Sequence, residues 1–291
     1  MKAVFTVLSI LLGIVFYRAY SYSFLIQYLL MFMLFFTFLG VKVNRFHKNT
    51  LWIVVANIVI AFTFYLLVLP FNSGLALICF ITAITPTATA APAITSFLHG
   101  DVQYVTFSVI LTNSIVALNI PWILPLLVEQ NHPISTKSIL FSVLFLFLIP
   151  LVAAQVVKAI NPRLKESLLK YKIVSFYAWN IVVFLASARA TYCIFNEAKT
   201  EPKMIVLIAL SSLVICIVNF SIGKLIGGKH FAQEASQSLG QKNTMLTVWL
   251  SLTFLGPVVA LGPMFYIIYH NFYNSYQLLQ IENPRKAKVV A

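Results

Sequence analysis

The chain has 291 residues, of which 60% are hydrophobic and 9% are charged, and its formal net charge is +13. Soluble domains carry a charge at about 25% of their positions, so this composition excludes a soluble globular protein and indicates a polytopic membrane protein. The three cysteines lie far apart in or beside apolar runs, which excludes a CxxC metal pair and a secreted disulfide framework.

Cutting the chain at polar, proline and glycine clusters predicts ten membrane spans. A spanning helix needs about 20 mostly apolar residues; the first segment is short, and the fourth and ninth are interrupted. The first segment also resembles a signal peptide, but it lacks a small-residue cleavage site and is interpreted as a span. The predicted spans are residues 3–17, 22–41, 51–69, 74–98, 102–128, 138–157, 173–195, 204–226, 231–254 and 257–277.

Basic residues in the loops predict the orientation of these spans. Fourteen Lys and Arg residues lie in alternate loops on one side and four on the other, and Arg189 and Lys242 fall within spans. Cytoplasmic loops hold the excess of basic residues, so we expect both termini and the 158–172 loop on the cytoplasmic side. We expect the membrane to be the bacterial inner membrane. The loops near 70–73, 129–137 and 196–203 are then external. The basicity is a topology signal and does not indicate nucleic-acid binding.

The ten spans divide into two halves, residues 1–135 and 136–291, and an odd number of spans per half forces opposite orientations. In each half the fourth span is broken, by "ITPTATAAPAITSF" (84–97) and by "SQSLGQKNTM" (236–245). Broken helices at matching positions of inverted halves are typical of secondary transporters, which bind substrate near the midplane. The alternative, two simple kinks, explains the prolines but not the polar residues at both places. Those residues include Thr87, Thr89, Ser238, Gln241, Lys242 and Asn243.

Lys242 is the most unusual of these residues. A charge inside a bilayer costs at least about 2.5–3.5 kcal/mol, so chains that carry one there generally use it. Lys242 is predicted to be a fixed counter-charge for an anion or a proton-coupling group, because buried lysines change protonation state readily. The alternative is that it lies near the end of its span and reaches water.

The stretches "PTATAAPAITSFLHGDV", "NIPWILPLL" and "SLGQKNTMLTVWLSL" resemble the bile acid:sodium symporter family. The fourth span of that family carries P-x-x-T-A running into T-x-x-L-x-x-G-[N/D], and its ninth carries E-x-G-x-Q-N. "LLMFMLFFTFLGVKVNRF" also resembles its second span. The resemblance implies a panel of spans 1, 2, 6 and 7 and a core of spans 3–5 and 8–10. The broken spans would cross, with an organic anion bound between panel and core. The matching residues are Pro86, Thr89, Ala90, Thr95, Gly100, Asp101, Pro121, Gly240 and Asn243.

The departures from that family concern its two sodium sites. Sodium is a hard cation that needs several oxygen ligands, and none of the seven acidic residues lies near the middle of a predicted span. The resemblance therefore implies a degenerate sodium site, with no metal or cofactor, at which Lys242 replaces the cation. Where the family has its sodium-ligand side chains, this chain has Ala91, Pro92, Val105, Val109, Ser238 and Lys242.

Four further residues are weaker candidates for the site. Asn57 lies close to where the family has a site glutamine, and Asn113 falls on the fifth span. Asn180 and Arg189 lie on the seventh span, nine residues or about 14 Å apart along a helix. Such side chains also serve simply as hydrogen-bonding contacts between membrane helices, and Arg189 equally fits an interfacial arginine.

These observations predict an all-α, alternating-access transporter of an organic anion, either bile-acid-like or a small carboxylate. The partners expected are the anion and the lipid bilayer. A sodium-coupled symporter using other ligands is one alternative, and a passive channel is another. An intramembrane enzyme needs a catalytic set at one depth, whereas all five histidines, including His270, are expected in loops or near span ends, so we do not expect an enzyme.

Overall fold

The computed structural model describes residues 2–40, 47–128, 135–160, 162–171, 174–197 and 201–282. Throughout these ranges the regular elements are helices, and pairing of the β type is limited to one isolated bridge. The first part of the chain forms α1 (Lys2–Val15), the 3₁₀ helix η1 (Tyr17–Tyr22), α2 (Leu25–Gly40), α3 (Asn49–Val68), α4 (Ser73–Ile84), α5 (Ala91–Phe97) and α6 (Val102–Leu127). The second part forms α7 (Thr136–Ile160), α8 (Pro162–Lys170), α9 (Val174–Tyr192), the π-helical η3 (Cys193–Glu197), α10 (Pro202–Gly240), α11 (Thr244–Leu250), the π-helical η4 (Ser251–Leu255) and α12 (Pro257–Glu282).

Five helical segments in the described residues are long and apolar enough to cross a membrane: Asn49–Val68, Val102–Leu127, Thr136–Ile160, Val174–Asn196 and Pro202–Gly240. Three shorter apolar segments are Leu25–Gly40, Ser73–Ile84 and Thr244–Leu255. Large apolar side chains such as Leu66, Leu126 and Phe145 are exposed on the outer faces of these helices, as lipid contact requires. By length and composition the fold is that of an all-α membrane protein.

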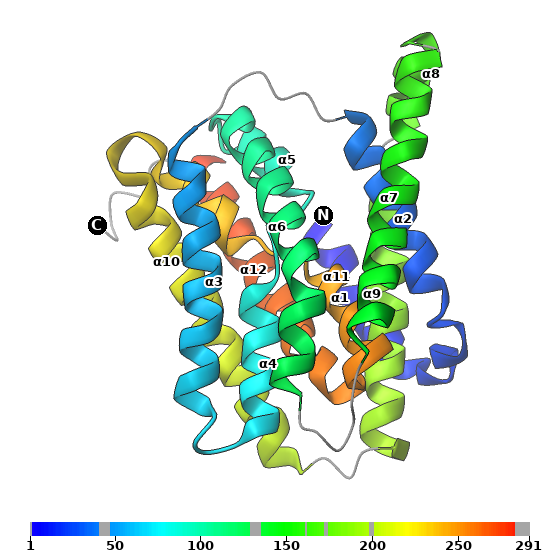
Figure 1. The fold of residues 1–291 in the computed structure, drawn as a ribbon, viewed down its shortest axis with the longest axis vertical. Coiled ribbons are helices and arrows are strands. Elements are labelled where there is room, and N and C mark those ends of the chain that lie inside the picture. Colours follow the sequence, from blue (N-terminus) through cyan, green and yellow to red (C-terminus); the bar gives the residue numbers. More distant parts are fainter. Residues whose placement is uncertain are drawn as a thin grey trace.

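The predicted eighth span and the first part of the ninth lie within α10, which contains a reversal of the backbone, while α11 and η4 form the rest of the ninth. Gly228 has φ 57° and ψ −144°, and Phe231 has φ −130° and ψ 27°; the first of these conformations is open to glycine and costly for other residues. Figure 1 shows the chain turning back at this point. A Cβ at Gly223 would lie 2.6 Å from the Ala235 carbonyl oxygen, so the two arms of α10 pack backbone against backbone.

The helices form two groups that pack mainly within themselves. One group contains α1, α2, α7 and α9, and the other contains α3, α4, α6, α10 and α12. Helix α11 lies between these groups in Figure 1 and packs on α12 and on α2, whereas α5 packs on α6 and α10 of the second group. The second part of the ninth predicted span therefore lies at the boundary between the two groups.

The segments that connect the helices lie at two opposite ends of the molecule. The turn Leu69–Asn72 between α3 and α4 lies at the lower end in Figure 1, and α8 lies at the upper end. Asn72 begins α4 because its side chain accepts a hydrogen bond from the Leu75 amide at 2.7 Å, a standard N-cap. One expectation needs correction here: the segment 158–172 is not simply a loop, because Pro162–Lys170 forms α8.

Candidate functional site

The two breaks predicted from the sequence lie against each other as a short antiparallel pair. The Ala88 amide donates to the Gln241 carbonyl at 2.7 Å, and the Asn243 amide donates to the Pro86 carbonyl at 2.7 Å. The isolated bridge between Thr87 and Lys242 lies between these two bonds. Each break thus satisfies part of the backbone that the other leaves unpaired, which a membrane interior requires. We call this element, residues 85–90 and 241–243, the crossing.

Local sequence explains the break between α4 and α5. The residue before a proline is disfavoured in the helical region, and Thr85, which precedes Pro86, has ψ 128°. Pro92 stands in the first turn of α5, where its missing N–H costs no hydrogen bond. The segment 85–90 is therefore non-helical by composition.

Lys242 binds the C-terminal end of α4. Its ammonium donates to the Ala83 carbonyl at 3.0 Å and to the side-chain oxygen of Asn57 on α3. The other side-chain atom of Asn57, Nδ2, donates to the Ile84 carbonyl at 2.8 Å. A cation at this end of a helix interacts favourably with the helix dipole, by up to about 2 kcal/mol when partly buried. Lys242 is 2% exposed, so the alternative in which it reaches water is wrong for this conformation.

The C-terminal end of α10 is satisfied by neutral hydroxyl groups. Thr87 Oγ1 donates to the Ser238 carbonyl at 2.5 Å, and the Tyr266 hydroxyl donates to the Gly240 carbonyl at 2.7 Å. The corresponding positions at α4 are taken by a cation and an amide. The positive charge is therefore placed at only one of the two helix ends that meet at the crossing.

Helix α6 supports the crossing through two adjacent residues. Thr112 Oγ1 accepts a hydrogen bond from the Thr87 amide at 3.0 Å, and Asn113 Nδ2 donates to the Thr87 carbonyl at 2.8 Å. Asn113 Oδ1 in turn accepts from Asn243 Nδ2 at 3.2 Å. The structure thus brings together five of the predicted residues, namely Asn113, Thr87, Asn243, Lys242 and Asn57.

The side chains at the positions that the sequence resemblance aligned with sodium ligands offer few oxygens. Ala91, Val105 and Val109 are buried and apolar, and Pro92 is half-buried. The Ser238 hydroxyl and the Gln241 side-chain carbonyl are buried and have no hydrogen-bond partner within the described residues. The residues that the structure describes also hold no group of three or more His, Cys, Asp or Glu side chains suited to a metal ion.

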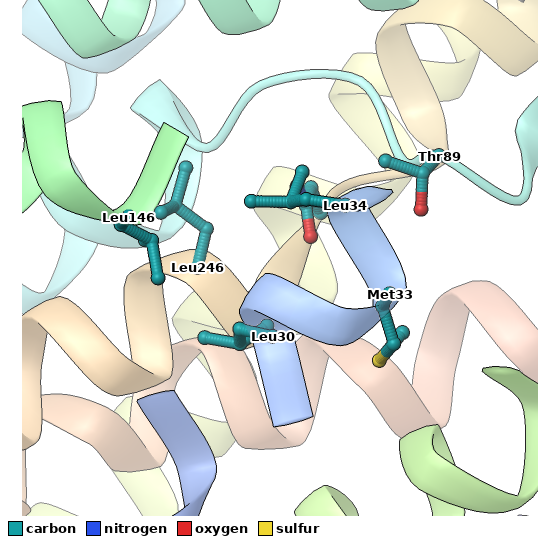
Figure 2. Close-up of a pocket in the computed structure, with 7 residues that line it drawn as sticks. Leu30, Met33, Leu34, Thr89, Leu146 and Leu246 are labelled. Carbon is teal, nitrogen blue, oxygen red and sulfur yellow. The ribbon is translucent and has the colours of Figure 1, made fainter. Parts of the chain in front are cut away.

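A small cavity lies where α2 and α7 meet the crossing (Figure 2). Its volume of about 10 Å³ corresponds to about one water molecule. Thr89 and Asn243 are the polar residues that line it, while Lys242 does not contribute to the wall because its ammonium is directed at α3 and α4. The apolar lining residues are Leu30, Met33, Leu34, Leu146 and Leu246.

Asn180 and Arg189 lie outside this site. Asn180 donates to the Phe176 carbonyl on its own helix at 2.8 Å and accepts from Ser9 of α1 at 3.2 Å. The Arg189 guanidinium lies 5.7 Å from the ring centre of Tyr20 and 5.9 Å from that of Tyr192. Both residues thus belong to the contact of α9 with α1 and η1.

Sequence reasoning missed Thr112 and Tyr266, which bond the crossing or the helix end beside it, and Asn219, which donates to the Tyr266 hydroxyl at 3.2 Å. Thr112 adjoins Asn113 in "LTNS", so the polar pair was a usable signal, whereas Tyr266 and Asn219 stand alone in apolar runs. His270 was expected near a span end, but it is buried within α12. The assignment of His270 to a loop or span end was wrong because α12 continues to Glu282.

Comparison with known proteins adds no identification. No family model matches this chain, and no curated protein matches it.

Proposed function

We propose that this protein is a secondary transporter of an organic anion that works by alternating access and does not depend on sodium. The observation that carries the proposal is the crossing, in which two broken helices pair through their backbones around a buried lysine. Irregular backbone at membrane depth is tolerated where it is buried in protein or lines a cavity. In transporters such breaks supply the substrate and ion sites.

The architecture we propose has ten membrane spans in two inverted five-span repeats, residues 1–135 and 136–291. The grouping of the helices supports it: α1, α2, α7 and α9 correspond to the expected panel, and α3 to α6 with α10 to α12 correspond to the core. This arrangement, together with the sequence motifs, favours a divergent member of the bile acid:sodium symporter family. We place it in a bacterial inner membrane with both termini in the cytoplasm.

Lys242 provides in this proposal the positive charge that a sodium ion provides elsewhere. At about 4 Å, two like unit charges repel by about 4 kcal/mol at an effective dielectric of 20, which is roughly a thousandfold in affinity. A sodium ion and a protonated Lys242 therefore do not share the crossing. The apolar side chains of Ala91, Val105 and Val109 further remove oxygen ligands.

The anion binds in this scheme between the panel and the crossing. The cavity lined by Thr89 and Asn243 marks the place, and its volume of about 10 Å³ is too small for an organic acid. Transport therefore requires α2 and α7 to separate from the crossing. The Thr89 hydroxyl and the Asn243 side-chain amide contact the carboxylate of the anion. Lys242 acts on that carboxylate through its charge at a distance and by holding the end of α4 in place.

The test is uptake into proteoliposomes of two carboxylate probes, taurocholate and pyruvate, with and without an inward sodium gradient. We expect saturable uptake of at least one probe that the sodium gradient leaves unchanged. Lys242→Gln keeps an amide donor and should fold yet lose most of this uptake, while the surface variant Lys165→Gln on α8 should transport normally.

Three results would contradict the proposal. Sodium-stimulated uptake together with normal transport by Lys242→Gln would favour a sodium symporter that uses other ligands. Uptake that does not saturate would favour a channel. Chemical conversion of a probe inside sealed vesicles would favour an enzyme.

A further inference from the structure

One face of α12 is polar and buried between Tyr266 and Gln277. Tyr266, His270 and Asn274 are buried and Gln277 is half-buried. They stand at positions i, i+4, i+8 and i+11, a spacing that places side chains on one face of a helix. This face packs against α10 and takes no part in the anion site proposed above.

The two arms of α10 supply polar partners to this face. Asn219 Nδ2 donates to the Tyr266 hydroxyl oxygen at 3.2 Å. Gln237 Nε2 donates to Asn274 Oδ1 at 3.2 Å and to Gln277 Oε1 at 2.6 Å. The rings of Tyr266 and His270 meet edge to face, with centroids 5.6 Å apart. The polar side chains therefore follow one another at intervals of three or four residues, from the crossing toward the C-terminal end of α12.

Several polar atoms in this set have no hydrogen-bond partner within the part of the chain that the structure describes. They are Asn219 Oδ1, Gln237 Oε1, His270 Nδ1 and Asn274 Nδ2. Buried polar groups are nearly always paired with protein or with ordered water, and an internal water molecule typically bonds about three such groups. These unpaired atoms share one helix interface, so internal water is the partner that the general rule calls for there.

The inner end of this polar face lies at the crossing, because the Tyr266 hydroxyl donates at 2.7 Å to the carbonyl of Gly240, two residues before Lys242. Four titratable groups in the described residues of these two helices are buried, namely Cys216 and Glu234 of α10 and Tyr266 and His270 of α12. From α3 and α4 the described contacts of the ammonium are the uncharged Asn57 amide and Ala83 carbonyl. The C-terminal part of α12, which holds the outer end of this face, lies toward the end of the molecule that also carries α8 (Figure 1).

We propose that the polar face of α12 holds a file of internal water molecules that carries protons between Lys242 and the α8 end of the protein. In each cycle the Lys242 ammonium gives one proton to the file and becomes a neutral amine, and it later regains one proton. This inference rests on the proposed transport function for its role and makes the proton the coupling ion. The neutral amine still has two N–H donors for Asn57 and Ala83, so the crossing remains paired in both states.

The first experiment tests the water file without any substrate. Hydroxyl radicals generated by an X-ray pulse in the full-length protein in nanodiscs modify side chains next to bound water. We expect Tyr266 and His270 to be oxidised several-fold faster than the buried controls Phe80 and Trp249. Asn274→Leu should slow the oxidation of Tyr266, whereas Asn271→Leu should not, because Asn271 bonds its own helix at the Ile267 carbonyl. Protection of Tyr266 and His270 equal to that of Phe80 overturns the proposal and leaves the polar face as a contact between helices.

The second experiment tests the proton coupling with taurocholate and pyruvate in proteoliposomes. An inward gradient of one pH unit should accumulate the transported probe by up to about tenfold for one coupled proton. Asn274→Leu should lose this accumulation but retain exchange of internal for external probe, because exchange needs no net proton movement. Asn271→Leu should keep both accumulation and exchange. Full accumulation by Asn274→Leu overturns the proton route. Absence of uptake in the wild type counts against the proposed function. The hydroxyl-radical experiment alone decides whether the water file exists.

Discussion

Replacement of Asn57 by leucine should destabilise the protein through two separate losses. Asn57→Leu removes an acceptor from the buried Lys242 ammonium and a donor from the Ile84 carbonyl. A hydrogen bond to a charged group contributes about 1.5–3 kcal/mol, and a buried carbonyl left unpaired costs about 1–3 kcal/mol. The expected loss in the free energy of unfolding is therefore about 2.5–6 kcal/mol. Asn119→Leu is the matched control, because Asn119 is exposed and bonds its own helix, and it should change stability little.

The same reasoning predicts that a second substitution partly rescues the first. In Asn57→Leu the ammonium of Lys242 is buried with one acceptor fewer, so Lys242→Met removes a poorly satisfied charge. The double variant should be more stable than the sum of the two single effects by about 1.5–3 kcal/mol, as expected for residues in direct contact. Denaturant unfolding in detergent, followed by tryptophan fluorescence, measures all four proteins. Additive effects within error would refute the view that Asn57 and Lys242 stabilise the crossing as a pair.

Three further predictions follow from the packing, the cavity and the topology. Gly223→Ala should sharply reduce the yield of folded protein, because a Cβ there meets backbone 2.6 Å away, whereas Gly40→Ala, which meets only a leucine methyl at 3.5 Å, should be tolerated; size-exclusion profiles after detergent extraction compare them. Thr89→Val keeps the volume of the side chain but removes the hydroxyl from the cavity, so the KM for the transported anion should rise by about tenfold or more, and an unchanged KM would place the anion elsewhere. In a protein without native cysteines, a membrane-impermeant maleimide applied to intact cells should label Phe71→Cys, which is 87% exposed, and should spare Lys165→Cys; the opposite pattern would invert the topology.

The fold could be predicted largely because lipid imposes a simple requirement on sequence. The helix ends lie within a few residues of the predicted spans at α3, α6 and α7, where apolar runs are bounded by polar or proline-containing segments. The two breaks were equally visible, since Pro86 and Gly240 with their polar neighbours interrupt otherwise apolar stretches. Helix α8 was missed because its residues are mostly polar, and a search for apolar length does not respond to a short polar helix.

The site was predictable where polar residues cluster and not where they act singly. The cluster of Gln241, Lys242 and Asn243 located one side of the crossing, and its partner on the other side followed from the matching break. Tyr266 contributes through one hydroxyl at the end of an aromatic ring, so in sequence it cannot be told from a packing residue. The direction of the Lys242 side chain was also beyond sequence, because the choice between α4 and the cavity depends on carbonyls that only the folded backbone brings within reach.

The pairing of the two breaks bears on how the protein is made. Thr87 and Ser238, joined by a hydrogen bond at the crossing, are 151 residues apart, so the first break must wait for most of the chain to be synthesised before its partner exists. Until then residues 85–90 carry unpaired backbone groups that lipid cannot solvate. A ribosome-bound chain that ends before residue 241 should therefore hold α4 and α5 near an aqueous or protein-lined environment such as the translocon. Release of the fourth span into lipid would then depend on synthesis of the ninth, so membrane insertion would be completed only when about the last fifth of the chain is made.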